Sequence, residues 1–241
     1  MDVLLTNDDG IRAVGLRALY DALLTRGHTV HVVAPMRQQS GVGHSLTVFE
    51  PLRAYPFNQD DFHGLGIYGT PTDCVKLALS MLLEKKPDIV MSGINAGPNV
   101  GPDILYSGTV GAATEACHQG LASMAFSNDD ESQTDIQSKA RHAVALAESI
   151  DNYPKGPLSK NRGLRVCRQT TAVWKNDYLE RRDPRGSRYW WLMGEIPPET
   201  INAGSDKDLL SRGFITVTPL RFDFTDEDTI RVLDALQLPE N

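Results

Sequence analysis

Short apolar runs alternate with amphipathic helical segments along the first 150 or so residues, and this alternation limits the fold more than any other feature of the sequence. The run VLLT (3–6) is followed by a segment (10–27) in which leucines recur at helical spacing until Gly27. Chains in which strands and helices follow one another in this way form parallel sheets with helices on both faces. We therefore expect an α/β fold with a doubly wound, mostly parallel sheet.

The same alternation continues down the chain. The segment that begins TPTD is expected to start a helix at Thr70, because a threonine cap, Pro71 in the first position and Asp73 in the third are typical of helix starts. A hairpin is expected between residues 45 and 69. Further strands are predicted at 29–35, 88–93 and 122–127, and further helices at 70–87, 107–120 and 135–150.

Beyond residue 150 the pattern changes. We expect one domain across residues 1–241, with the α/β core in 1–150 and a C-terminal arm with closing elements in 151–241. The aromatic residues Tyr189, Trp190 and Trp191 either dock on a partner subunit or pack locally in a core. The elements predicted here are a Pro/Gly/Lys-rich connection (152–163), a strand (164–174), an exposed hairpin arm (181–195), a late strand (213–225) and a closing helix (226–236).

The formal charge of −7, from 24 basic and 31 acidic residues, argues against broad binding to nucleic-acid polymers or anionic membranes. Three separated cysteines without a CxxC motif indicate a reducing compartment. No apolar run approaches the roughly 18 residues of a membrane span, and the start lacks the pattern of a signal peptide. These features favour a cytoplasmic protein.

Four polar loops follow predicted strands or enter the next helix. Ligands of an open parallel sheet bind beyond the carboxyl ends of its strands, so these loops are the first place to look for chemistry. Their sequences are TNDDG (6–10), PMRQQSGVGHS (35–45), SGINAGPNVG (92–101) and YSGTVG (106–111).

Two adjacent acids, Asp8 and Asp9, lie in the first of these loops. Two carboxylates about 4 Å apart repel by about 4 kcal/mol at an effective dielectric constant of about 20, and a divalent cation would offset that repulsion. Ser40 and Asn95 add neutral oxygen donors, and the set suits Mg²⁺ or Mn²⁺. The alternative is that the acids are turn residues, one capping a helix that begins near Gly10.

The SGTVG segment offers a second feature. Ser107, Gly108 and Thr109 place hydroxyls and free N–H groups at a helix start, which is a natural anion site, or else an ordinary serine cap. His44 is either an acid/base or phosphate donor or a polar surface residue. The P-loop, dinucleotide and nucleophile-elbow motifs (GxxxxGK[ST], GxGxxG, GxSxG) do not occur in the sequence.

In this order along the chain, the sequence contains the motifs TNDDG, APMRQQSGVGHSLT, GTPTDCVKLAL, SGINAGPNVGPDILYSGTVGAATE, DPRGSRYWW and DKDLLSRGFITVTPL. Together these motifs resemble the SurE family of stationary-phase survival proteins. The resemblance is dense from Asp2 to about Ser127 and implies a Rossmann-like core and a divalent-metal-dependent phosphatase of nucleoside 5′- and 3′-monophosphates, with some activity on short polyphosphate. It also implies a C-terminal arm exchanged between subunits of a homodimer or homotetramer.

By position, the resemblance implies that one cation per subunit binds at Asp8, Asp9, Ser40 and Asn95, with the two acids as catalytic residues. It implies in turn that the phosphate lies against Asn7, Gly41, Asn95, Ser107, Gly108 and Thr109. Attack by water and a covalent route through Asp8 both stay open.

The chain departs from the family pattern in two places. Met36 stands where the family usually has aspartate, and no asparagine-rich strand is seen after about residue 150. The altered C-terminal half motivates an alternative function, a nucleotide-binding sensor that keeps the fold but has little turnover.

Overall fold

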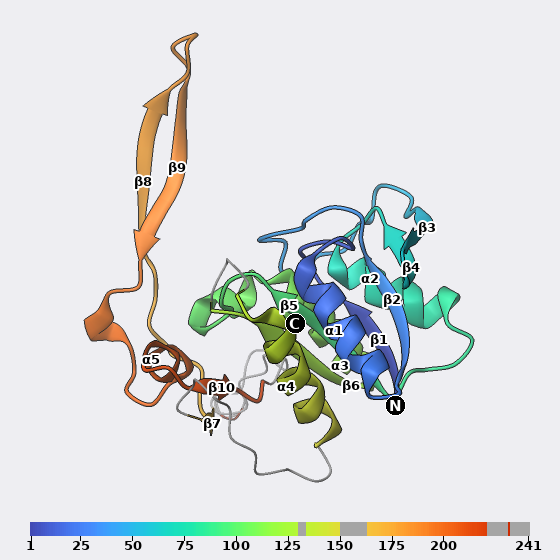
Figure 1. Cartoon of the computed structure of the whole chain (residues 1–241). Coiled ribbons are helices and arrows are strands. Elements are labelled where there is room, and N and C mark those ends of the chain that lie inside the picture. The colour runs from blue at the N-terminus through green and yellow to red at the C-terminus, as the bar shows by residue number, and fades with distance from the viewer. Residues whose placement is uncertain (130–133, 150–162, 221–230, 232–241) are drawn as a thin grey trace.

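The computed structural model describes residues 1–129, 134–149, 163–220 and 231, and at its centre lies a six-stranded sheet (Figure 1). The strand order is β3-β4-β2-β1-β5-β6, in which the edge strand β3 runs antiparallel to β4 and the other neighbours are parallel. The α/β fold expected from the alternation is therefore confirmed. The strands are β1 (Asp2–Thr6), β2 (Thr29–Pro35), β3 (Ala54–Gln59), β4 (Phe62–Ile67), β5 (Ile89–Asn95) and β6 (Ala122–Ser127).

Helices cover both faces of this sheet, as a doubly wound fold requires. Val3 and Leu5 of β1 belong to an apolar cluster with residues of α1 and α4, whereas Leu4 belongs to a second cluster with residues of α2 and α3. Because successive side chains of a strand point to opposite faces, β1 is buried on both sides. The four helices are α1 (Val14–Thr25), α2 (Pro71–Leu77), α3 (Gly108–His118) and α4 (Ile136–Glu148).

The first helix begins later than predicted. Its N-cap is Ala13, without a side-chain cap, and not a residue near Gly10. The residues before it form a turn in which Asn7 Oδ1 accepts from the Gly10 N–H at 3.2 Å and Asn7 Nδ2 donates to the Gly10 carbonyl at 3.0 Å. The alternative in which one of the two acids caps this helix is therefore excluded, because Asn7 closes the turn and Ala13 occupies the cap.

The helix predicted at 70–87 has the expected start but not the expected length. Thr70 and Asp73 form a capping box with Pro71 in the first turn. The regular helix ends at Leu77 and continues as a π-helical turn, η1 (Ala78–Leu82), because the Leu83 N–H donates to the Ala78 carbonyl at 3.0 Å, five residues back.

The predicted hairpin arm is present and longer than expected. Strands β8 (Lys175–Arg182) and β9 (Arg188–Glu195) pair antiparallel and project away from the rest of the molecule (Figure 1). Tyr189, Trp190 and Trp191 are 41%, 54% and 62% exposed. Local core packing is therefore not the explanation for these aromatic residues in the described structure.

The C-terminal part is built from short elements. The strand predicted at 164–174 is limited to β7 (Leu164–Val166), which pairs in parallel with β10 (Ile215–Val217), and helix α5 (Asp206–Ser211) precedes β10. Two 3-10 turns, η2 (Gly101–Leu105) and η3 (Pro198–Thr200), complete the elements. Nearly all of the predicted 152–163 connection, the end of the late strand and all but one residue of the closing helix lie outside the described residues.

None of the helices in the described parts of the chain is both long enough and apolar enough to cross a membrane.

Helix α1 packs closely against the end of strand β5 through a glycine. Gly15 lies in the first turn of α1, where a Cβ would overlap the Ile94 carbonyl oxygen. Helix propensity alone makes Gly→Ala stabilising by about 1 kcal/mol. We expect the overlap to reverse that sign, so that Gly15→Ala destabilises by about 2 kcal/mol in urea unfolding. Val14→Ala, at an exposed position of the same turn, is the control; a Gly15→Ala variant more stable than wild type would contradict the contact.

Candidate active site

The strand order reverses at β1, and this is the point of an open sheet where a ligand crevice forms. Strand β1 pairs in parallel with β2 on one side and with β5 on the other. Asp8 and Asp9 follow β1, Ser40 lies in the loop after β2, and Asn95 ends β5. The topology therefore brings the three loops to the same edge.

Hydrogen bonds join these loops directly. The Asp8 carbonyl accepts from the Gln39 N–H at 2.7 Å, next to Ser40. The Asp9 carboxylate accepts from the Ala96 N–H at 3.0 Å through Oδ2, next to Asn95. The structure thus gathers the four oxygen-bearing residues predicted as metal ligands around one edge of the sheet.

Asp8 contacts the start of α3. Thr109 Oγ1 donates to Asp8 Oδ1 at 2.5 Å, and Asp8 is only 5% exposed. A Cβ on Gly108 would lie 2.9 Å from the Asp8 Cβ, so the glycine allows this close approach. The carboxylate therefore sits at the positive end of α3 rather than at the start of α1.

Burial has a consequence for the charge of both acids. It raises the pKa of Asp8 above its ordinary value, although the hydrogen bonds from Thr109 oppose the shift. It also raises the pKa of Asp9, where the Ala96 hydrogen bond opposes the shift and the neighbouring Asp8 charge adds to it. A buried and a half-buried carboxylate with raised pKa values are both stabilised in their charged form by a bound positive charge.

Asn95 is oriented with its amide oxygen free. The pairing of β5 with β6 shifts register between Ser92 and Asn95, and such bulges re-aim side chains near active sites. Asn95 Nδ2 donates to the Gly97 carbonyl at 2.8 Å, and no described residue donates to Oδ1. An amide held by its nitrogen presents its oxygen as a ligand.

The donors at this edge fit a hard divalent cation. Ser40 Oγ accepts from Gln38 Nε2 at 2.9 Å and keeps a further lone pair. Together with two carboxylates and the Asn95 amide oxygen, it makes an all-oxygen set of the kind that Mg²⁺ and Mn²⁺ take. Within the described residues, no three His, Cys, Asp or Glu side chains group together as a metal site, so the serine and asparagine oxygens are needed to complete this one.

Among the residues predicted on the phosphate side, Gly41 and Ser107 lie around the start of α3, whereas Asn7 lies in the turn that carries the two acids. Gly41 lies in the loop that packs on the first turns of α3, where the Gly43 N–H donates to the Tyr106 carbonyl at 2.8 Å. A Cβ on Gly111 would lie 2.5 Å from the Gly43 carbonyl oxygen, so this packing is tight. Ser107 acts as an ordinary cap, with its Oγ accepting from the Val110 N–H at 3.1 Å.

Asn7 lies in the turn that follows β1. Its side chain is fully buried and bonded to Gly10 through both polar groups, so it holds the turn that carries the two acids. The contact between Asp9 and the Ala96 N–H was not foreseen, since a backbone donor leaves no side-chain signal in the sequence.

His44 turns toward α3. Its Nε2 lies 3.0 Å from Glu115 Oε2, and its ring stacks on His118 with 5.7 Å between centroids. Burial acts to raise the pKa of Glu115, but hydrogen bonds from Gln119, His44 and Lys76 outweigh it and hold that pKa below its ordinary value. His44 therefore pairs with a carboxylate on the helix.

Met36, the departure noted in the sequence, packs over Gly66 and against the apolar cluster beneath α1.

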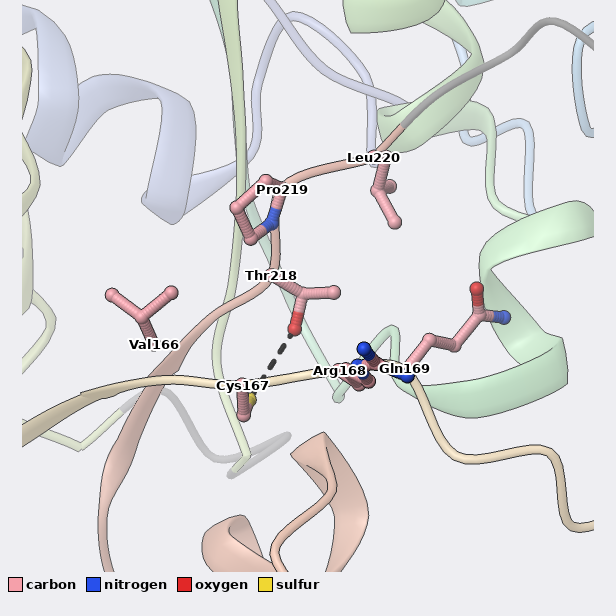
Figure 2. A pocket seen from close by; sticks show the side chains of 7 residues that line it. All are labelled: Val166, Cys167, Arg168, Gln169, Thr218, Pro219 and Leu220. Atoms are coloured by element: carbon pink, nitrogen blue, oxygen red, sulfur yellow. Dashed lines mark hydrogen bonds between the residues drawn. The ribbon is translucent and has the colours of Figure 1, made fainter.

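A hollow of about 550 Å³ lies in the C-terminal part of the chain (Figure 2). It is open rather than enclosed, and Cys167 Sγ lies 3.5 Å from Thr218 Oγ1 among the residues that line it. None of the residues predicted at the site contributes to its wall. The lining residues are Val166, Cys167, Arg168, Gln169, Thr218, Pro219 and Leu220.

Comparisons with known proteins show the family of the chain. A family model described as "Survival protein SurE" matches residues 3–176. A protein of Desulfovibrio desulfuricans named 5′-nucleotidase SurE is 64% identical, over 99% of both chains. A protein of the same name from Nitratidesulfovibrio vulgaris (strain Miyazaki F) is 56% identical, over 98% of this chain and 93% of its own.

A solved structure is also similar. The SurE protein from Aquifex aeolicus superposes with a TM-score of 0.82 at 36% identity, over 98% of this chain and 99% of its own. The likeness therefore extends over the whole length rather than the sheet alone.

The raised pKa of Asp8 predicts a pH-dependent effect on stability. Because its pKa is higher in the folded than in the unfolded chain, ionised Asp8 costs folding free energy, and the cost grows as pH rises above the ordinary aspartate pKa of about 3.9. In metal-free protein we therefore expect Asp8→Asn to raise the melting temperature at neutral pH. The gain should vanish below about pH 3.5, where both states are protonated.

Thermal unfolding in chelator across this pH range measures the effect. Glu84→Gln, an exposed carboxylate outside the site, is the control and should show no such trend. An Asp8→Asn variant less stable than wild type at neutral pH would contradict the assignment.

Proposed function

The chain belongs to the SurE family, and we propose that it hydrolyses nucleoside 5′- and 3′-monophosphates to nucleoside and phosphate. The name 5′-nucleotidase SurE on relatives up to 64% identical over nearly their full length supports this activity. The observation that carries it is that Asp8 and Asp9 meet the start of α3 and the end of β5 at the reversal of the sheet. Short polyphosphate is a further proposed substrate.

We assign one Mg²⁺ or Mn²⁺ to Asp8, Asp9, Ser40 and Asn95. When bound, such a cation supplies positive charge that polarises a phosphoryl oxygen and stabilises charge developing in the reaction. The protein prepares the ligands in advance, because Thr109 fixes Asp8, the Ala96 N–H fixes Asp9, and Gly97 fixes the Asn95 amide. Preorganised ligands need no rearrangement when the charge arrives.

The phosphate is proposed to bind between this ligand set and the start of α3. Helix N-termini carry free N–H groups and partial positive charge, and both favour phosphate. Ser107, Gly108 and Thr109 supply the first turn of α3, and Gly41 lies in the loop packed against it. Asn95 contributes from the other side, and Asn7 keeps the acids in place.

Asp9 is the better candidate to take up the proton of the attacking water. It is less buried than Asp8, so its carboxylate is more accessible to that water. Asp8 keeps one oxygen bonded to Thr109 and serves to orient the site. A phosphorylated Asp8 peptide trapped by acid quench would instead support the covalent route.

The sensor alternative rests on the altered C-terminal half, of which the structure describes residues 163–220 and 231. Identity of 64% to a relative named as a nucleotidase favours the enzyme.

The hairpin arm is proposed to join two or four copies of the chain. Apolar side chains on both of its strands are exposed, including Tyr178, Leu179, Tyr189 and Trp191. An isolated two-stranded hairpin with such a surface is expected to bury it against a partner. We also propose that residues 1–241 form one domain in each subunit, with the α/β core in 1–150 and the arm and closing elements in 151–241.

A cytoplasmic location is part of the same proposal. Cys74, Cys117 and Cys167 are all free thiols in the structure, as a reducing compartment favours.

Phosphate release from AMP tests the activity. We expect turnover with Mn²⁺ and none with excess chelator. Asn95→Ala should weaken Mn²⁺ affinity by at least about tenfold with little loss of stability, because it removes a ligand oxygen at the rim. Asn99→Ala is the matched control in the same loop, since Asn99 bonds to Ser127 instead. Turnover that is unaffected by chelator, or an Asn95→Ala variant with wild-type Mn²⁺ affinity, would contradict the proposal.

Light scattering tests the arm. The double variant Tyr189→Ser/Trp191→Ser removes two aromatic rings that contact each other edge to face on β9. We expect it to shift the protein toward monomer at micromolar concentration, because the apolar contact with the partner is lost. Arg185→Ser, in the exposed turn of the hairpin, should leave the oligomer unchanged. A double variant that keeps the wild-type mass would reject this role for the arm.

A further inference from the structure

The buried carboxylate of Asp206 lies far along the chain from the two acids of the site. Asp206 is 1% exposed and accepts three backbone N–H groups, from Gly101, Thr170 and Lys207, each at 2.7 Å. Within the described residues its partners are therefore backbone amides rather than a basic side chain. Charge-assisted bonds of this kind are stronger than bonds between neutral groups.

Gly101 is held from both sides by the C-terminal segment. Its N–H donates to Asp206 Oδ2, and its carbonyl accepts from Gln169 Nε2 at 2.5 Å. The residue has a φ of +56°, and a Cβ there would lie 2.6 Å from Thr170 Cγ2. The backbone N–H and the backbone carbonyl of Gly101 are thus both held by residues that come well after the sheet in the sequence.

The position of Gly101 in the chain gives these contacts a consequence for the site. Gly101 lies between Asn95, the proposed metal ligand, and Ser107, which caps α3. A further bond secures the same stretch, because Trp174 Nε1 donates to Asp103 Oδ1 at 2.7 Å. A loop whose two ends both enter the site transmits any displacement of its middle to the site.

We propose that Asp206 is a positioning residue of the active site. By fixing Gly101, it sets the path of residues 96–107 and with it the place of the Asn95 amide and of the first turn of α3. This inference rests on the proposed function, because it assigns Asp206 to the same metal and phosphate site.

A carboxylate is needed at this position because donors approach both of its oxygens. Gly101 donates to Oδ2, whereas Thr170 and Lys207 donate to Oδ1. An asparagine has one acceptor oxygen, so Asp206→Asn places an NH₂ group against at least one backbone N–H. The variant keeps the volume of the side chain and loses the bond to Gly101 or the bond to Thr170.

The test compares Asp206→Asn with Asp208→Asn in the full-length protein. Asp208 lies on the same helix, but it accepts from the Gly204 N–H and pairs with Arg212, away from the loop. We expect Asp206→Asn to weaken Mn²⁺ binding, measured by electron paramagnetic resonance, by about tenfold. Hydrogen exchange of residues 96–105 should rise, and AMP hydrolysis should recover toward wild type as Mn²⁺ is increased. Asp208→Asn should change none of these.

Gln169→Leu is the second variant and leaves Asp206 intact. It removes the donor to the Gly101 carbonyl. Like Asp206→Asn, it should weaken Mn²⁺ binding and raise hydrogen exchange of residues 96–105. It therefore tests whether the anchoring of Gly101 positions the site if Asp206→Asn does not fold. A variant that unfolds earlier but keeps wild-type Mn²⁺ affinity and wild-type exchange of the loop would overturn the proposal. If the wild type fails to hydrolyse AMP, the proposed function fails, while Mn²⁺ affinity and exchange still decide the role of Asp206.

Discussion

The crowding of two carboxylates at the end of β1 is the constraint around which this part of the molecule is arranged. Asp8 is nearly fully buried, and burial raises the pKa values of both acids. Among the described residues, hydrogen-bond donors without a positive charge contact the two acids. The Thr109 hydroxyl donates to Asp8, and the Ala96 amide donates to Asp9. Such an arrangement holds the acids in place and leaves their charge for a cation to neutralise.

The fold places that charge where a ligand has access. Because the strand order reverses at β1, the loops after β1 and β5 meet at one edge of the sheet, and the start of α3 contacts Asp8 there. Glycines then allow backbone to approach: Gly108 against Asp8, and Gly111 against the Gly43 carbonyl. Sheet topology and local packing thus converge on the same edge.

The sequence predicted the parts of this arrangement that depend on local patterns. The alternation of apolar runs and helices predicted the parallel sheet, and polar residues at strand ends predicted which loops meet. The start of α1 was missed because Asn7 and Gly10 close a turn of their own before the helix. The Ala96 amide and the bonds from Asp206 to Gly101 had no sequence signal, because backbone donors carry no residue identity and the latter pair is 105 residues apart.

We propose that oxygens from separate loops share one divalent ion at this edge of the sheet. Anomalous diffraction from crystals grown with Mn²⁺ tests it most directly. We expect one strong peak per subunit within coordination distance, about 2.0 to 2.4 Å, of oxygens of Asp8, Asp9 and Asn95. A fully occupied Mn²⁺ peak elsewhere, with these oxygens left uncoordinated, would contradict it.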